Sequence, residues 1–156
     1  MLSSIVLLDA GLVGLACLEP GRPSAAAFHG WLQAMLTSKA DVYIADLTRY
    51  EVRRELVRIG AAAKLRRLDR LCDLLVNAPV TAEAWERAGE FWAAVRRAGR
   101  PTASPEALDA AAILAGVAAT IGQPGDAVIV ATTNVRHLNW FPGVDARAWP
   151  DVAPPA

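Results

Sequence analysis

Four polar residues of this chain stand beside runs of apolar residues, where folding could bring them into one site. They are Asp9, Glu51, Asp109 and Asn134. Asp9 directly follows the branched apolar run 5–8, which is typical of a strand covered on both faces in a parallel sheet. Because ligands bind in the crevice outside the carboxyl ends of such strands, we expect Asp9 at the lip of a binding site.

Three of these four residues are carboxylic acids. Acids gathered in one crevice repel each other, and burial raises their pKa values further. A divalent cation reverses that cost, and hard oxygen ligands favour Mg²⁺ or Mn²⁺, which can activate a water for attack on a phosphate. The residues therefore indicate metal-dependent cleavage of a phosphodiester bond. The metal ligands would be Asp9, Glu51 and Asp109, with Asn134 positioning a water or a phosphate.

A simpler interpretation exists for each of these residues. A single acid at a strand end or a helix N-terminus is more often a cap or a surface charge than a ligand, and Asn134 could be a turn residue. Only the shared placement of the residues at strand exits favours a site.

Charge is unevenly distributed along a chain whose net charge is zero. Residues 49–70 hold eight Lys and Arg against three Asp and Glu, a local net charge of +5. A basic segment in a neutral protein favours a polyanionic partner, and we assign RNA binding to Arg53, Arg54 and Arg58. The alternative is an ordinary solvated helix face.

Hydrophobic patterning predicts an α/β protein with strands and helices in alternation. We expect buried strands at 5–8, 41–45 and 127–131, with short edge strands at 76–80 and 146–149. We expect helices at 24–36, 48–56, 65–75, 81–97 and 107–121. Thr48 as N-cap would place Glu51 in the first turn, near the positive end of the helix dipole. Trp85 and Trp92 would be core residues or part of a dimer face.

Length and composition predict one domain, at residues 1–150, followed by a short proline-rich tail at 151–156. Cys17 and Cys72 have no metal or redox spacing and are expected to be buried thiols in a reducing compartment. The first apolar segment lacks a basic flank, and no apolar stretch is long enough to span a membrane. We therefore expect a cytoplasmic protein.

Several phrases of the sequence resemble the successive motifs of PIN-domain ribonucleases, most closely the VapC-type toxins of bacterial toxin–antitoxin pairs. The phrases are 7–9, 50–56, 99–102 with 108–109, and 131–138. The resemblance implies a three-layer α/β/α PIN-like fold with a central, mainly parallel sheet. It also implies an acidic site binding Mg²⁺ or Mn²⁺, cleavage of RNA, and an antitoxin that blocks the site. Asp9 and Glu51 match the first two family acids, and Asn134 matches the fourth position.

The third family acid is missing at its usual place. The family phrase that resembles residues 108–115 usually reads Leu-Asp-Ala-Asp, so Asp109 matches its first acid and Ala111 occupies the position of the metal-site Asp. Two positions along a helix correspond to a rotation of about 200°, so Asp109 need not replace the missing carboxylate. It could still reach a metal if it precedes the first full turn.

These observations favour a Mg²⁺- or Mn²⁺-dependent ribonuclease, the endoribonuclease toxin of a toxin–antitoxin pair. The alternative is a weakened or inactive PIN domain, with Ala111 in place of the third acid, that still binds antitoxin or RNA. A third possibility is an α/β binding module whose acids are caps. The expected partners are RNA and an antitoxin protein, and the chain is expected to form a homodimer with no membrane association.

Overall fold

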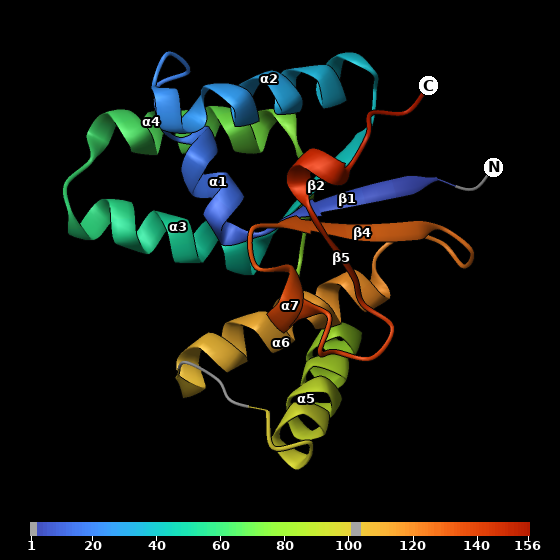
Figure 1. Cartoon of the computed structure of the whole chain (residues 1–156). Helices are drawn as coiled ribbons and strands as arrows, with labels where there is room; N and C mark the ends of the chain where they lie inside the picture. The colour runs from blue at the N-terminus through green and yellow to red at the C-terminus, as the bar shows by residue number, and fades with distance from the viewer. Residues whose placement is uncertain (1–2, 101–103) are drawn as a thin grey trace.

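The computed structural model describes residues 3–100 and 104–156, and these form a five-stranded sheet with helices on both faces (Figure 1). The strands are β1 (Ser4–Leu8), β2 (Asp41–Ala45), β3 (Val76–Ala78), β4 (Ala127–Thr132) and β5 (Asp145–Ala148). Their order is β3-β2-β1-β4-β5, and every pairing is parallel. The predicted central strands are confirmed, and both short strands lie at the edges, as expected. Pro101 and Thr102 of the resembling phrase 99–102 lie outside the described residues.

The helices divide into two layers. They are α1 (Ala10–Ala16), α2 (Pro23–Thr37), α3 (Asp46–Arg58), α4 (Ala62–Leu74), α5 (Ala82–Arg97), α6 (Pro105–Thr120) and the short α7 (Val135–Leu138). Figure 1 shows the first four on one side of the sheet and the last three on the other. The predicted three-layer α/β/α architecture with a central parallel sheet is confirmed. No described helix has the length and apolarity that crossing a bilayer requires.

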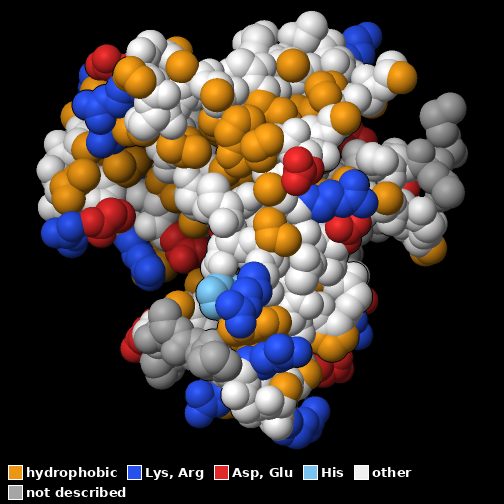
Figure 2. Space-filling model, in the orientation of Figure 1, with side chains coloured by type: hydrophobic (Ala, Val, Ile, Leu, Met, Phe, Trp, Pro, Cys, Tyr) orange, Lys and Arg blue, Asp and Glu red, His pale blue; other side chains and the backbone are white. Residues whose placement is uncertain are grey.

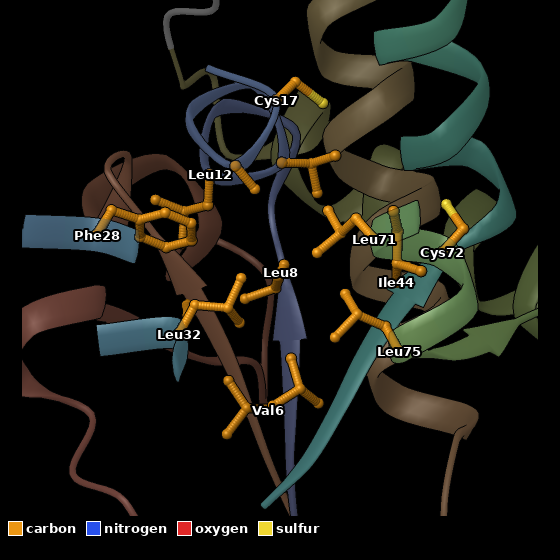
Figure 3. Close-up of a cluster of buried hydrophobic side chains, with 14 of the residues drawn as sticks. Val6, Leu8, Leu12, Cys17, Phe28, Leu32, Ile44, Leu71, Cys72 and Leu75 are labelled. Carbon is orange, nitrogen blue, oxygen red and sulfur yellow. The ribbon is translucent and has the colours of Figure 1, made fainter. Parts of the chain in front are cut away.

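Alternating side chains of β1 build both halves of the core. Val6 and Leu8 point into the cluster formed with α1, α2 and α4, which Figure 3 shows around them. Leu7 points the other way, into the cluster formed with α5 and α6. Since successive residues of a strand face opposite sides of the sheet, a continuous apolar run requires helices on both faces.

The two cysteines belong to the first of these clusters. Cys17 and Cys72 are both buried free thiols, as expected. Burial raises the pKa of the Cys17 thiol to about 11. A thiol that stays protonated at neutral pH is a poor nucleophile, so Cys17 acts here as a small apolar residue.

The C-terminal segment packs on α2. A 3₁₀ turn at Trp149–Asp151 leads to Val152, which is 3% exposed. The indole N–H of Trp31 donates a hydrogen bond of 2.8 Å to the carbonyl oxygen of Val152. The predicted division of the chain after residue 150 stays a prediction.

The start of α3 differs from the sequence prediction. The helix begins at Asp46, directly after β2, and its N-cap Ala45 offers no side-chain hydrogen bond. Thr48 is therefore a buried residue inside the helix and not its cap, and Glu51 lies in the second turn. The argument from the helix dipole does not apply to Glu51, because that effect is confined to the first turn.

The two tryptophans of α5 also differ from the prediction of a buried stripe. Ala88 and Val95 are buried, but Trp85 is 53% exposed and Trp92 is 40% exposed. The core interpretation of these rings is wrong. They line a surface groove between α5 and α6.

A glycine sets the distance between α5 and α6. A Cβ atom at Gly116 would meet the backbone carbonyl oxygen of Ala84 and, at 3.0 Å, the backbone nitrogen of Ala88. Backbone atoms of a helix cannot move aside as the end of a side chain can. The two helices can therefore pack this closely only because residue 116 has no side chain.

We predict that Gly116→Ala lowers the free energy of unfolding by about 1–3 kcal/mol, through overpacking between α5 and α6. The matched control is Gly89→Ala in α5, where an added Cβ meets nothing within 4 Å. This change should stabilise the protein by about 0.5–1 kcal/mol, since alanine is the better helix former. Urea denaturation of the two variants measures both effects, and shifts of the same sign would contradict the prediction.

Candidate functional site

Asp9 is held at the carboxyl end of β1 by hydrogen bonds to both of its carboxylate oxygens. The backbone N–H of Ala10 donates to Oδ1 at 2.7 Å, so Asp9 caps the N-terminus of α1. The hydroxyl of Thr132 donates to Oδ2 at 2.6 Å. Asp9 is therefore a helix cap, which was the alternative to a metal ligand in the sequence analysis. Each oxygen keeps a further lone pair, so the cap does not prevent the carboxylate from binding a cation.

Glu51 approaches the same region from α3. Burial is the main cause that raises the pKa of its carboxyl group above the ordinary value, and the nearby charge of Asp9 raises it further. The guanidinium of Arg54 acts in the opposite direction. Glu51 and Arg54 line a hollow of about 400 Å³ together with Ala10 and Gly11 of α1. The structure thus brings Asp9 and Glu51 together.

Asn134 joins the group through the loop that follows β4. Its backbone N–H donates to the hydroxyl oxygen of Thr132 at 2.8 Å, and that hydroxyl in turn donates to Asp9. The side-chain oxygen of Asn134 is hydrogen-bonded to Nδ1 of His137. Neither Thr132 nor His137 was assigned to the site in the sequence analysis. The available signal was the run of polar residues at the end of a buried strand.

Asp109 does not lie with these residues. It is exposed and lines the groove between α5 and α6, beside Trp85 and Trp92. Ala111 faces the other way and lines a pocket shared with Asn134. The two positions point in different directions, as the rotation along a helix predicts.

Two carboxylates, and not three, therefore converge at the end of β1. Within residues 3–100 and 104–156, no cluster of three or more His, Cys, Asp or Glu side chains could hold a metal ion. The expected set of Asp9, Glu51 and Asp109 is thus not assembled in this structure, and its role in metal binding stays a prediction.

The arginines assigned to RNA binding have different surroundings. Arg53 lies 3.8 Å from a carboxylate oxygen of Asp69, and Arg58 forms an ion pair with Glu55. Arg54 packs over the ring of Tyr50, at 5.2 Å from its centroid, and borders the hollow with Glu51. Figure 2 shows basic and acidic side chains interspersed over the visible face. Of the three arginines, Arg54 alone lines the hollow beside Glu51.

The strand order, the helices on both faces and the polar cluster at the carboxyl edge define the chain as an α/β/α protein with a PIN-like fold. No protein-family model and no curated protein matches the sequence.

Solved structures of VapBC and FitAB proteins share this fold over nearly the whole chain. VapBC2 from Rickettsia felis, bound to a promoter DNA fragment, matches with a TM-score of 0.70 and 14% identity, covering 93% of this chain and 98% of that one. DNA-bound VapBC from Salmonella typhimurium matches with a TM-score of 0.70 and 19% identity, covering 96% and 99%. FitAcB from Neisseria gonorrhoeae matches with a TM-score of 0.67 and 19% identity, covering 94% and 99%. The resemblance to the VapC type is thus confirmed at the level of the fold.

We predict that Glu51→Gln raises the free energy of unfolding at pH 7. Burial raises the pKa of Glu51 above its ordinary value in the folded state, so the ionised form of Glu51 destabilises the fold. The parent chain therefore loses stability relative to the glutamine variant as pH rises through the pKa that Glu51 has in the folded state. Below pH 4.5 the two proteins should differ less in their free energy of unfolding. Urea denaturation at several pH values measures this dependence.

Glu55→Gln is the matched control on the same helix. The hydrogen bond from Arg58 lowers the pKa of Glu55, so its ionised form stabilises the fold above the ordinary pKa and loses that effect as pH falls. This variant should be slightly less stable than the parent at pH 7. Equal effects of the two substitutions would contradict the opposite environments of the two carboxylates.

Proposed function

We propose that the chain is a Mg²⁺- or Mn²⁺-dependent endoribonuclease, the toxin of a toxin–antitoxin pair. The observation that carries the proposal is the convergence of Asp9 and Glu51, from β1 and α3, at the carboxyl edge of a sheet whose fold is shared with VapBC structures. Two acids brought together at that edge, one of them partly buried, incur a cost that a cation would remove.

The donor set fits a magnesium ion held by few protein ligands. Mg²⁺ commonly keeps several waters and is bound by one or two carboxylates together with substrate phosphates. Asp9 and Glu51 supply two carboxylates, so the phosphate of RNA would complete the set. A cation bound there would polarise the scissile phosphate and lower the pKa of the attacking water.

The remaining residues orient the donors. The bonds from Thr132 and Ala10 hold the carboxylate of Asp9 in one direction. The contact between Asn134 and His137 occupies the amide oxygen of Asn134, which leaves the amide N–H groups to donate to a phosphate oxygen or a water. Both effects are forms of preorganisation, which lowers the cost of orienting groups during the reaction.

A weakened or inactive PIN domain is the second candidate function. The observation that favours it is the position of Ala111, whose methyl group faces the pocket beside Asn134, while Asp109 lies in the groove with the tryptophans of α5. Loss of one carboxylate lowers the negative charge of a metal site and should weaken cation binding. In this form the chain would retain binding of an antitoxin or of RNA.

Three partners follow from the proposal: an RNA substrate, an antitoxin protein and a second copy of the chain. The structural neighbours are VapBC and FitAB complexes, which supports an antitoxin as partner. The exposed rings of Trp85 and Trp92 support a homodimer, since aromatic residues are enriched at interfaces. The proposed location is the cytoplasm, where RNA is available.

We predict that the chain cleaves single-stranded RNA in the presence of Mn²⁺, and that Asp9→Ala lowers the rate by about 100-fold or more. Ala111→Asp should raise the rate, because it restores a carboxylate on the face of α6 that lines the pocket with Asn134. Gel analysis of a labelled RNA, with and without EDTA, measures the three rates side by side.

The outcomes of this comparison separate the two candidate functions. Cleavage by the parent chain that is lost in Asp9→Ala would support the active enzyme. Cleavage by Ala111→Asp alone would support a domain that lacks its third ligand. If none of the three proteins cleaves RNA, the ribonuclease proposal is wrong.

We further predict that Arg54→Ala weakens RNA binding more than Arg58→Ala does. Arg54 borders the hollow with Glu51, whereas Arg58 is paired with Glu55. Loss of one phosphate contact should reduce the slope of log K against log salt by about 0.7 for a single strand. Fluorescence anisotropy at four salt concentrations measures the slopes. Equal slopes for both variants would mean that Arg54 is an ordinary solvated residue and does not contact RNA.

A further inference from the structure

A small pocket lies between α6 and α7, with Asn134 as one of its lining residues. Its volume is about 100 Å³. It is lined by Ala107, Leu108 and Ala111 of α6, by Asn134 and His137, and by Trp140 and Phe141. Apart from Asn134 and His137, these are apolar or aromatic residues. The pocket therefore offers a flat ligand apolar contacts and a single polar edge.

The aromatic wall of the pocket is built by contacts along one short segment. The ring of His137 meets that of Trp140 edge to face, with 4.4 Å between their centroids and an interplanar angle of 85°. A hydrogen bond between Nδ1 of His137 and the side-chain oxygen of Asn134 also holds the imidazole in place. Two rings fixed in this way form a rigid surface, which lowers the entropic cost of binding a planar group.

The opposite wall depends on an alanine. Ala111 is the position where an aspartate would turn a carboxylate toward Asn134, and its methyl group leaves that wall apolar. Ala107, one turn earlier on α6, is exposed at the same pocket. The space left by these small side chains is what a planar ring can enter.

Basic groups flank the pocket. The guanidinium of Arg100 lies over the ring of Trp140 at 5.6 Å from its centroid, and Arg136 is exposed on α7. Figure 2 shows a histidine side chain beside basic side chains where α7 lies. An apolar slot with aromatic walls and cations at its rim has the chemistry that binds a base and its phosphate backbone in single-stranded nucleic acid.

We propose that this pocket binds one nucleobase of the RNA, adjacent to the phosphate held near Asp9 and Glu51. The inference rests on the proposed ribonuclease function and adds a subsite for the substrate. The two sites share Asn134, whose backbone is tied to Thr132 and whose side chain is tied to His137. A base seated against Trp140 would fix the position of the neighbouring phosphate at the acidic site.

The test measures how much of the RNA affinity depends on bases. Fluorescence anisotropy gives the Kd for an adenosine octanucleotide and for a ribose-phosphate octamer without bases, with Ca²⁺ in place of Mg²⁺ and with gel analysis to verify that the RNA is intact. The ratio of the two Kd values removes the contribution of the backbone charge. We expect the parent chain to bind the octanucleotide about tenfold more tightly, the size of effect that one stacked base produces.

Ala107→Leu should occupy the pocket and bring this ratio close to one, while Asp9, Glu51 and Asn134 themselves remain unsubstituted. The matched control is Ala119→Leu, an exposed position near the other end of α6, which should leave the ratio unchanged. Trp140→Phe should preserve much of the ratio and Trp140→Leu should abolish it, since a ring is needed for stacking.

Each outcome bears on one of the two proposals. If the parent chain binds both octamers equally, or if Ala107→Leu keeps the tenfold ratio, the base subsite is overturned while RNA binding stands. Equal binding would also favour an apolar side chain of a protein partner as the occupant. If the parent chain binds neither octamer, the proposed function fails and the subsite fails with it.

Discussion

The candidate site depends on the two hydrogen bonds that the hydroxyl group of Thr132 makes, one to Asp9 and one to the backbone of Asn134. Leu8 and Ala131 are partners in the register of β1 and β4, so the next residues, Asp9 and Thr132, emerge side by side. Thr132 is fully buried, and its hydroxyl donates to Asp9 while it accepts the N–H of Asn134. Because a buried hydroxyl that loses its partner costs about 1–3 kcal/mol, this link also holds the end of β1 to the loop after β4.

The two carboxylates of the site consequently differ in their surroundings. Asp9 accepts two hydrogen bonds, so the orientation of its carboxylate is set by the fold. Among the described residues, none donates such a hydrogen bond to Glu51. Burial and the charge of Asp9 raise the pKa of its carboxyl group, and Arg54 compensates in part. One acid is thus a fixed donor and the other carries an electrostatic cost. A cation bound by both carboxylates would relieve the cost of ionising Glu51.

The sequence predicted the layers and the position of Asp9 at the end of β1 because those features depend on local patterning. The apolar run 5–8 needs covering on both faces, and Asp9 follows it in the chain. The hydrogen bonds of Thr132 could not be read in this way, since they depend on the register between strands far apart in sequence. The start of α3 at Asp46 was missed because it has no side-chain cap, and the exposure of Trp85 was missed because periodicity identifies a helix face but not whether another element covers it.

The alanine at position 111 changes how metal and substrate would depend on each other. With two carboxylates instead of three, a cation at the site would be held weakly by the protein alone, and the phosphate of RNA would supply the missing negative charge. Coupling of this kind is reciprocal, so the cation would strengthen RNA binding by the factor by which RNA strengthens cation binding. The same alanine leaves an apolar wall beside Asn134, where a base could add affinity that does not depend on charge. Under the two proposals, the loss of a metal ligand and the gain of a base contact would be two consequences of one small side chain, and both would act on the same bound RNA.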